Sequence, residues 1–268
     1  MKLAITGIKE AKENDPIVFR GNFQNMIQKA ANIGYDGMEL HIHDSSKLDR
    51  EKLKRIFQEN NITLTSIGTG SAYTRDHISL SCEEMAYRYA AIDRIREHII
   101  TASEYGAVVI LGLINGLVRE CINKDSFRNN FTSSLETILK YAEHYKVKLV
   151  IEVLNRYESD FLNTIDAGLK FISTFNTPYL MLHIDTYHMN IEEKSIPLAI
   201  KTAGSQIGHV HIADNDRWYA GHGHLEFKSI ILSLKEANYN GTLAIESFQY
   251  PNEDESAIKS YKILRNLI

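Results

Sequence analysis

The chain has 268 residues, of which 44% are hydrophobic, and a formal net charge of −4 at pH 7. This length and apolar content suit one large core, and the acidic balance argues against nucleic-acid or anionic-membrane partners, which favour a basic face. After Met1 and Lys2 the apolar opening is cut short by Lys9 and Glu10, and no later segment approaches the roughly 20 apolar residues of a membrane span. We therefore expect a cytoplasmic protein that acts on a small molecule.

Eight short apolar segments in chain order are typical of strands. They lie at residues 3–8, 37–42, 62–67, 107–113, 147–153, 180–185, 207–212 and 242–247. Segments with helical periodicity separate them, among them residues 23–34, 48–61, 83–106, 127–145 and 227–241. Strict alternation of strand and helix indicates parallel strands with right-handed crossovers. Because no linker or low-complexity tract interrupts the chain, the sequence predicts an α/β protein, a (β/α)8 TIM barrel, with residues 1–268 as a single domain.

The last four of these strands each end on a side chain that can bind a metal. These side chains, here called the strand-end quartet, are Glu152, Asp185, His211 and Glu246. They are separated by 33, 26 and 35 residues, close to the roughly 31-residue repeat of a barrel of this size. Since the loops after the strand carboxyl ends build the active site of such a barrel, we expect the four to be neighbours in space. Three carboxylates and one imidazole suit Mn²⁺, Mg²⁺ or Co²⁺ in an octahedral shell better than a structural Zn²⁺.

Other polar residues lie on the same strands. His183 shares a strand face with Asp185, and His209 with His211, because the side-chain period of a strand is two. We expect His183 and His209 one layer deeper in the barrel, as hydrogen-bonded core histidines. Glu39 also shares a strand face with the histidine two residues on, and there the sequence leaves a buried polar pair and a substrate contact equally open.

Four segments resemble the signature regions of the ketose 3-epimerases, the group of D-tagatose, D-psicose (allulose) and L-ribulose 3-epimerases among the xylose-isomerase-like barrels. The segments are IEVLNRYESDFLNT, MLHIDTYHMNIEE, GHVHIADNDRWYAGHGH and LAIESF. The resemblance is dense from about residue 148 to 250, and GYDGMEL around Glu39 is also similar.

This resemblance implies a function for particular residues. The strand-end quartet would bind one divalent cation, most often Mn²⁺, with Co²⁺ or Mg²⁺ as alternatives. Glu158, His188 and Arg217 would hold the sugar near its carbonyl end, and Glu152 and Glu246 would act as the acid/base pair. The resemblance also implies a homo-oligomer, either a dimer or a tetramer.

Epimerisation at C3 of a free 2-ketose is consistent with these groups. The reaction removes the proton on the carbon beside the carbonyl and returns one to the opposite face. A metal that bridges the C2 and C3 oxygens would stabilise the enediolate by Lewis acidity. Glu152 and Glu246 end the fifth and eighth strands, nearly across the barrel, so they can flank a sugar between them. The resemblance, with which this chemistry agrees, therefore implies a metal-dependent ketose 3-epimerase for a substrate of the D-psicose/D-fructose, D-tagatose or L-ribulose type.

Several alternatives share the barrel. Aldose–ketose isomerases and inosose isomerases or dehydratases use the same metal quartet, so the ligands do not separate them from epimerases. A metal-dependent endonuclease at abasic DNA would require further ligands and a basic face, and a non-catalytic sugar-binding barrel would not require both glutamates. A phosphorylated substrate is disfavoured because no glycine-rich cradle opens a helix. The first loop, residues 9–20, and the fourth loop, residues 111–120, lack the aromatic residues usual in the family, so the preferred ketose stays open.

Overall fold

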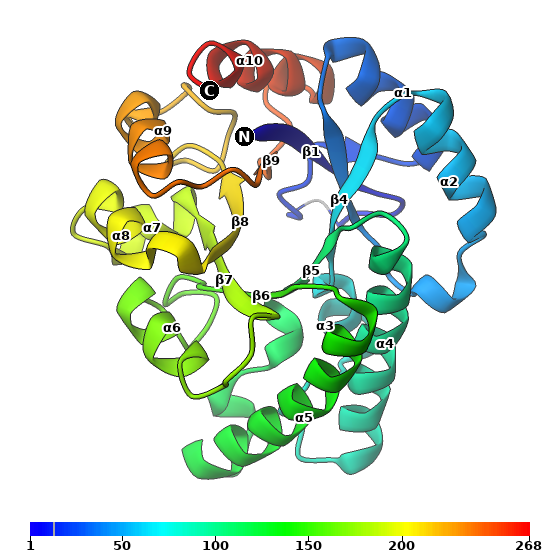
Figure 1. Cartoon of the computed structure of the whole chain (residues 1–268), viewed down its shortest axis with the longest axis vertical. Helices are drawn as coiled ribbons and strands as arrows, with labels where there is room; N and C mark the ends of the chain where they lie inside the picture. The colour runs from blue at the N-terminus through cyan, green and yellow to red at the C-terminus, as the bar shows by residue number, and fades with distance from the viewer. Residues whose placement is uncertain (13) are drawn as a thin grey trace.

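The computed structural model describes residues 1–12 and 14–268 and is a closed barrel of parallel strands surrounded by helices (Figure 1). The barrel strands are β1 (Lys2–Ile8), β3 (Gly37–His41), β4 (Thr63–Gly68), β5 (Val108–Leu111), β6 (Leu149–Glu152), β7 (Leu180–Asp185), β8 (Ile207–Ile212) and β9 (Thr242–Ile245). They pair in sequence order, and β9 pairs back with β1 to close the ring. The predicted TIM barrel is confirmed, and each of the eight predicted strands is present.

Helices follow the strands and form the outer layer. They are α1 (Phe23–Ile33), α2 (Arg50–Glu59), α3 (Gly70–Asp76), α4 (Met85–Ser103), α5 (Lys124–Tyr145), α6 (Ile165–Ile172), α7 (Thr186–Glu192), α8 (Ile196–Ala203), α9 (Phe227–Glu236) and α10 (Glu253–Arg265). Shorter pieces are the 3-10 turns η1 (Ser45–Lys47), η2 (Leu113–Asn115), η3 (Val118–Glu120) and η4 (Gly204–Gln206) and a strand, β2 (Phe19–Arg20), that pairs with the end of β1. Except for η4, these shorter pieces lie in loops that follow the carboxyl ends of strands.

Local signals in the sequence set the helix ends. The side chain of Asn22 caps the start of α1, and Gly34 ends it in a left-handed conformation with φ of 108°. Tyr261 of α10 packs so closely on Gly34 that a Cβ there would clash with the ring. Helix α5 begins three residues earlier than its periodicity predicts, because the side chain of Asn123 caps it and thereby adds a polar first turn.

The barrel interior is polar where the last strands meet. Toward the carboxyl ends of β7 and β8, the residues that alternate with the apolar ones are His183, Asp185, His209 and His211. These side chains face the barrel axis, since the ring of His183 contacts those of His209 and His211, and the latter two reach Glu39 of β3. A barrel core is usually filled by branched aliphatic side chains, so the polar layer itself indicates a site.

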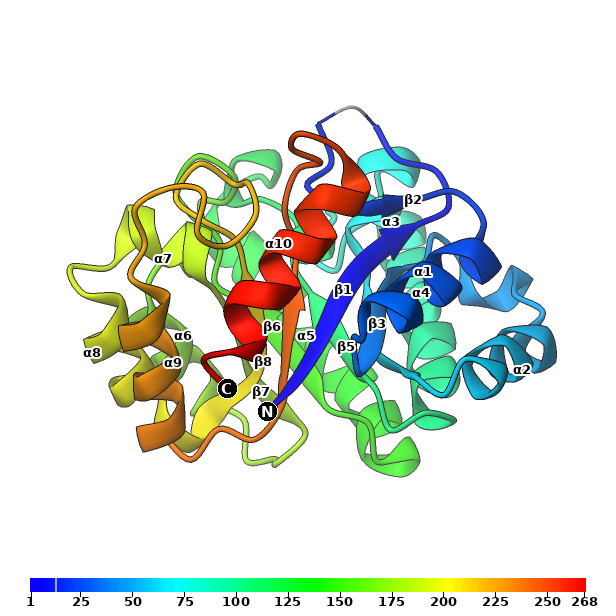
Figure 2. The same cartoon turned by 90° about the horizontal axis from the view of Figure 1, so that it is seen from above.

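All strand carboxyl ends open at one end of the barrel, beneath long loops (Figure 2). The two termini lie side by side at the opposite end (Figures 1 and 2). Within residues 1–12 and 14–268, no helix is both long and apolar enough to span a bilayer. One residue of the first loop, Glu13, lies outside the described residues.

Candidate metal centre and active-site cleft

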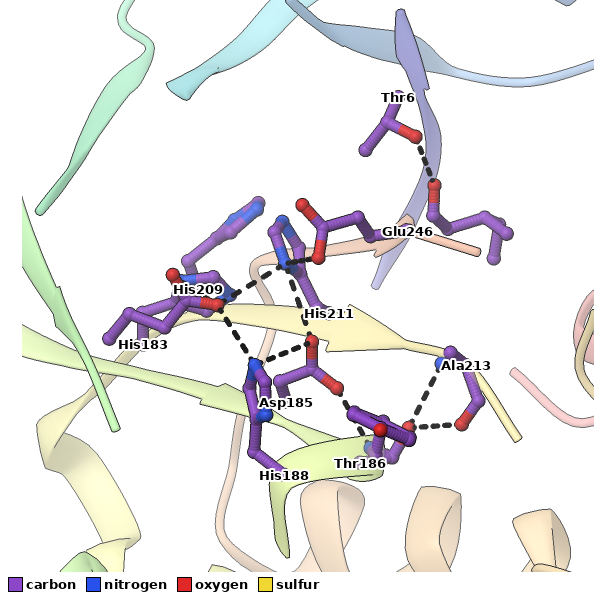
Figure 3. Close-up of polar contacts among 12 residues, drawn as sticks. Thr6, His183, Asp185, Thr186, His188, His209, His211, Ala213 and Glu246 are labelled. Atoms are coloured by element: carbon purple, nitrogen blue, oxygen red, sulfur yellow. Dashed lines mark hydrogen bonds and ion pairs between the residues drawn. The ribbon is translucent and has the colours of Figure 1, made fainter. Parts of the chain in front are cut away.

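The structure brings the strand-end quartet together at the carboxyl end of the barrel. Figure 3 shows three of its members, Asp185, His211 and Glu246. One potential ligand atom from each of the four side chains lies within 4.8 Å of the others. His211 Nδ1 is 3.2 Å from Glu246 Oε2, 3.7 Å from Asp185 Oδ2 and 3.8 Å from Glu152 Oε1. The four side chains therefore surround one point, to which His211 presents Nδ1 and the others present carboxylate oxygens.

Hydrogen bonds with the backbone fix the side chains of Asp185 and His211 relative to each other. Asp185 ends β7 and caps α7, where its Oδ1 accepts a hydrogen bond from Tyr187 N at 2.8 Å. The Oδ2 atom is thereby left facing His211. The hydroxyl of Thr186 donates to Ala213 O at 2.6 Å and accepts from Ala213 N at 3.0 Å, which ties the end of β7 to the end of β8 (Figure 3). Short side chains on paired strand ends need little ordering on binding, so this part of the site is preorganised.

The donor set fits a divalent cation. His211 is buried, and its Nδ1 has no hydrogen-bond partner in the described part of the chain although three carboxylates surround it. A buried ring nitrogen without a partner is costly unless something else satisfies it. Three oxygen ligands and one imidazole suit Mn²⁺, Co²⁺ or Mg²⁺, and a carboxylate-rich set without thiolates is poor for structural Zn²⁺.

Burial and neighbouring charges separate the pKa values of these groups. Burial, together with the charge of Glu246, raises the pKa of Glu152 well above its usual range. Burial opposes ionisation of Asp185 too, but the guanidinium of Arg217 outweighs it, so the pKa of Asp185 is well below normal. His211 and Arg217 likewise lower the pKa of Glu246 despite burial. The nearby carboxylates, Glu246 foremost, raise the pKa of His211 against the effect of burial. One carboxyl of the cluster thus retains its proton more readily than the others.

Each of the two glutamates divides its oxygens between the cluster and the cleft. Glu152 Oε1 faces His211, while its Oε2 lies against the backbone of Gly112. Glu246 Oε2 faces His211, while its Oε1 lies 3.5 Å from His41 Nε2. Both side chains line the cleft above the cluster. A carboxylate placed in this way can bind a cation with one oxygen and exchange a proton with the other.

The cleft encloses about 690 Å³, including its open mouth, a size ordinary for small-molecule sites. Its apolar wall is aliphatic, formed by Ile8, Ile17, Ile110, Leu113 and Leu154. No Phe, Tyr or Trp side chain of residues 1–12 or 14–268 lines it. This agrees with the sequence, in which the first and fourth loops lack the aromatic residues usual in the family.

Two of the three predicted sugar contacts lie at the cleft and share one partner. Asn155 Nδ2 donates to His188 Nδ1 at 2.7 Å and to Glu158 Oε1 at 2.9 Å. The proton of His188 therefore sits on Nε2, which is 3.8 Å from Glu152 Oε1. Burial lowers the pKa of His188, so the ring is a neutral donor aimed at the cluster. Glu158 is the more exposed of the pair and lines the cleft mouth.

The third predicted contact, Arg217, lies within the metal cluster as well as on the cleft wall. Its Nη1 is 2.5 Å from Asp185 Oδ2, and its Nη2 pairs with Glu246 Oε2. The guanidinium also lies over the ring of Tyr187, with its carbon 4.8 Å from the centroid. Arg217 has a φ of 64° in a tight turn in which its N donates to Asp214 O. The structure therefore gives Arg217 a charge-balancing position that the sequence did not predict.

The chain is similar to known proteins over most of its length. A family model described as a xylose isomerase-like TIM barrel matches residues 27–267. An L-ribulose 3-epimerase of Methylomonas sp. (strain DH-1) is 30% identical over 244 residues, which cover 90% of this chain and 84% of that relative. The chain belongs to the xylose isomerase-like TIM barrel family.

Within this family the chain groups with the ketose 3-epimerases. A D-psicose 3-epimerase of Agrobacterium fabrum (strain C58 / ATCC 33970) is 30% identical over 233 residues, which cover 84% of this chain and 79% of the relative. The crystal structure of D-allulose 3-epimerase from Methylomonas sp. in complex with D-allulose has a TM-score of 0.84 and covers 100% of this chain and 97% of that one. At 24% identity the latter shows the fold. The predictions of the family and of an isomerase that acts on carbohydrates are confirmed.

Two residues that shape the site, Asn155 and Gly112, could not be predicted from the sequence pattern. Asn155, which orients two cleft side chains, follows Glu152 by three residues and has no pattern of its own in the sequence. Gly112 had no signal beyond its place after β5.

His183 is buried as predicted, but neither of its ring nitrogens has a hydrogen-bond partner among the described residues, so that part of the prediction is wrong. His209 is the hydrogen-bonded core histidine that was predicted, with Nε2 2.8 Å from a carboxylate oxygen.

Gly112 gives a direct test of the position of Glu152. Replacing Gly112 by alanine places a methyl group well inside van der Waals contact with Glu152 Oε2, so the carboxylate must move. We expect kcat to fall by about 10²-fold, since a displacement of roughly 1 Å costs that much in a preorganised site. Gly70 also lines the cleft, but a Cβ there meets nothing within 4 Å, so Gly70→Ala is the matched control. Equal steady-state kinetics for the two variants would show that Glu152 tolerates displacement.

Proposed function

We propose that this chain catalyses the metal-dependent epimerisation of a free ketose at C3, with Glu152 and Glu246 as the acid/base pair. The single observation that carries the proposal is the divided placement of these two carboxylates. Each has one oxygen in the ligand cluster and the other facing outward, and both line the cleft. Epimerisation requires one proton-transfer group on each face of the carbon, and both groups must be fixed relative to the carbonyl.

We propose Mn²⁺ as the cation, with Co²⁺ or Mg²⁺ as alternatives, held by the strand-end quartet. When bound, a divalent cation supplies Lewis acidity toward the carbonyl oxygen and so makes the adjacent C–H more acidic. In the proposal Asp185 and His211 act as ligands to the cation and take no part in proton transfer. Glu152 and Glu246 bind the cation with one oxygen each.

The separated pKa values of Glu152 and Glu246 agree with their proposed role as an acid/base pair. In the cation-free protein the pKa of Glu152 is raised and that of Glu246 is lowered, so the two carboxyls differ in how readily each binds a proton. A pair of carboxyls whose environments separate their pKa values is the arrangement that acid/base catalysis at neutral pH requires. In the proposed reaction one glutamate removes the C3 proton, the enediolate forms, and the other glutamate delivers a proton to the opposite face. The roles exchange for the reverse epimer.

His188, Glu158 and Arg217 are the proposed sugar contacts. The neutral His188 offers an Nε2–H toward the cluster, where it can donate to an oxygen near the carbonyl end. Glu158 can accept from hydroxyls at the cleft mouth. The substrate class is a free ketose of the D-psicose/D-fructose, D-tagatose or L-ribulose type, in line with the names of the relatives. We also propose that the protein is cytoplasmic and forms a homo-oligomer, either a dimer or a tetramer.

Turnover in D₂O tests the reaction itself. The proton removed from C3 and the one returned belong to different glutamates, so we expect one solvent deuterium at C3 of each product molecule. The Mn²⁺-loaded protein is incubated with a panel of ketohexoses, ketopentoses and inosose, and products are identified by NMR. Heat-denatured protein controls for spontaneous exchange. A C3 epimer that carries no solvent label would contradict the two-base scheme, and turnover of inosose alone would indicate the related isomerase or dehydratase reaction.

A further inference from the structure

A fully buried carboxylate lies directly behind the metal cluster. Glu39 of β3 has no exposed surface and accepts four hydrogen bonds. His41 Nε2 and His211 Nε2 approach its Oε1, each at 2.9 Å. Ser66 Oγ at 2.6 Å and His209 Nε2 at 2.8 Å approach its Oε2. Four donors use all the lone-pair positions of a carboxylate, so Glu39 has no freedom to rotate.

The backbone explains how Glu39 reaches so many partners. The register between β3 and β4 shifts at Met38/Glu39, which places Ser66 directly opposite Glu39. Its imidazole partners His209 and His211 come from β8, 170 and 172 residues later, across the barrel axis. The carboxylate therefore bridges two layers of the interior. One oxygen serves the rings that border the cluster, and the other serves the layer below.

The contact with His211 determines which ring nitrogen faces the cluster. Because Nε2 donates its proton to Glu39 Oε1, Nδ1 is the nitrogen that points to the three carboxylates of the quartet. Resting on the proposed metal-dependent function, we propose that Glu39 is a positioning residue that fixes His211 in the orientation and tautomer that present Nδ1 to the cation. Glu39 is not one of the strand-end quartet and does not line the cleft, so in this proposal it acts through the ring that it holds.

The same oxygen also holds a residue of the cleft wall. His41 lines the cleft, and its Nε2 lies 2.9 Å from Glu39 Oε1 and 3.5 Å from Glu246 Oε1. Gly68 lies flat against this ring, and a Cβ there would clash with it. Because the contact with Glu39 is the shorter of the two, the Nε2 proton of His41 is directed to Glu39 rather than to Glu246. The outward oxygen of Glu246 stays available to the cleft as a result.

The test is Glu39→Gln, which preserves shape but removes the charge and turns one acceptor oxygen into a donor amide. In either amide orientation His211 loses the anion that raises the basicity of its Nδ1. We expect the Kd for Mn²⁺, measured by titration calorimetry, to weaken by about 10- to 100-fold. The Tm of the cation-free variant should show that it is folded. A folded Glu39→Gln protein that binds Mn²⁺ as tightly as the wild type would overturn the inference.

Ser66→Ala is the matched control, because it removes one donor to the same carboxylate and leaves both Oε1 contacts in place. We expect a lower Tm and an unchanged Kd for Mn²⁺. If Ser66→Ala weakens Mn²⁺ binding as much as Glu39→Gln, the effect is general loosening of the core and the inference is wrong.

A measurement on the wild-type protein covers the case in which Glu39→Gln does not fold. In ¹⁵N-histidine-labelled protein loaded with ¹¹³Cd²⁺, we expect one histidine to couple to the metal through Nδ1. Coupling through Nε2 would overturn the inference. A wild-type protein that binds neither Mn²⁺ nor Cd²⁺ would overturn the proposed metal site, and the role of Glu39 with it. Normal wild-type binding that Glu39→Gln leaves unchanged would overturn the role of Glu39 alone.

Discussion

Glu152→Gln and Glu246→Gln are each expected to lower kcat by about 10²- to 10⁴-fold, the usual contribution of a positioned acid or base. Glutamine retains the size of the side chain and an oxygen for the cluster, but it can neither accept nor deliver the C3 proton. The loss should appear in kcat more than in KM, because the sugar contacts of His188, Glu158 and Arg217 are left in place. Initial rates with D-psicose, D-tagatose and L-ribulose measure it.

A surface glutamate supplies the control for this pair. Glu236 on α9 forms an ion pair with Lys201 at 2.7 Å and is about half exposed, so Glu236→Gln makes the same chemical change far from the cleft. Its kcat should equal that of the wild type. If either active-site variant turned over within about tenfold of the wild type, that glutamate would not be a proton-transfer group. Labelling then separates the two roles, because a variant that lacks one base should still exchange the C3 proton of one epimer with solvent.

The positions of the strand-end quartet could be predicted because they depend on a simple geometric rule. Each residue ends a recognisable apolar strand, and parallel strands in a barrel bring their carboxyl ends to one rim. Spacing close to one repeat per ligand therefore implied proximity before any contact was known. The type of side chain then suggested the class of cation. Local pattern was sufficient for this part of the site.

The residues behind the quartet depend on contacts across the barrel, which leave no local pattern. Glu39 and His41 could be placed on one strand face, but nothing in their spacing indicated partners 170 and 172 residues away. Arg217 depends on a positive φ within one turn of a long loop, where L residues are uncommon. Helices α3 and α7 have seven residues each, too few for helical periodicity to be apparent. Gly112 matters only because a side chain from another strand lies on it.

Removing divalent cations is expected to abolish activity, and Mn²⁺ is expected to restore it. Without a cation, Arg217 and His211, whose pKa is raised, partly balance the three carboxylates of the quartet. A cation bound at 100 times its Kd would stabilise the folded protein by about 2.7 kcal/mol, so adding Mn²⁺ to the stripped protein should raise Tm. Dialysis against a chelator, followed by metal titration with paired rate and Tm measurements, tests both effects.

The apparent affinity of the stripped protein for Mn²⁺ is expected to rise with pH. A ligating imidazole must be free of its Nδ1 proton and a ligating carboxyl must be ionised, yet the pKa values of His211 and Glu152 are both raised in the metal-free protein. Binding therefore releases protons, and the apparent affinity for Mn²⁺ should rise with pH by up to about tenfold per unit for each proton released. Asp185, whose pKa is lowered, adds nothing to this slope. An affinity that falls as pH rises, or full activity after complete chelation, would mean that the quartet does not hold the catalytic cation.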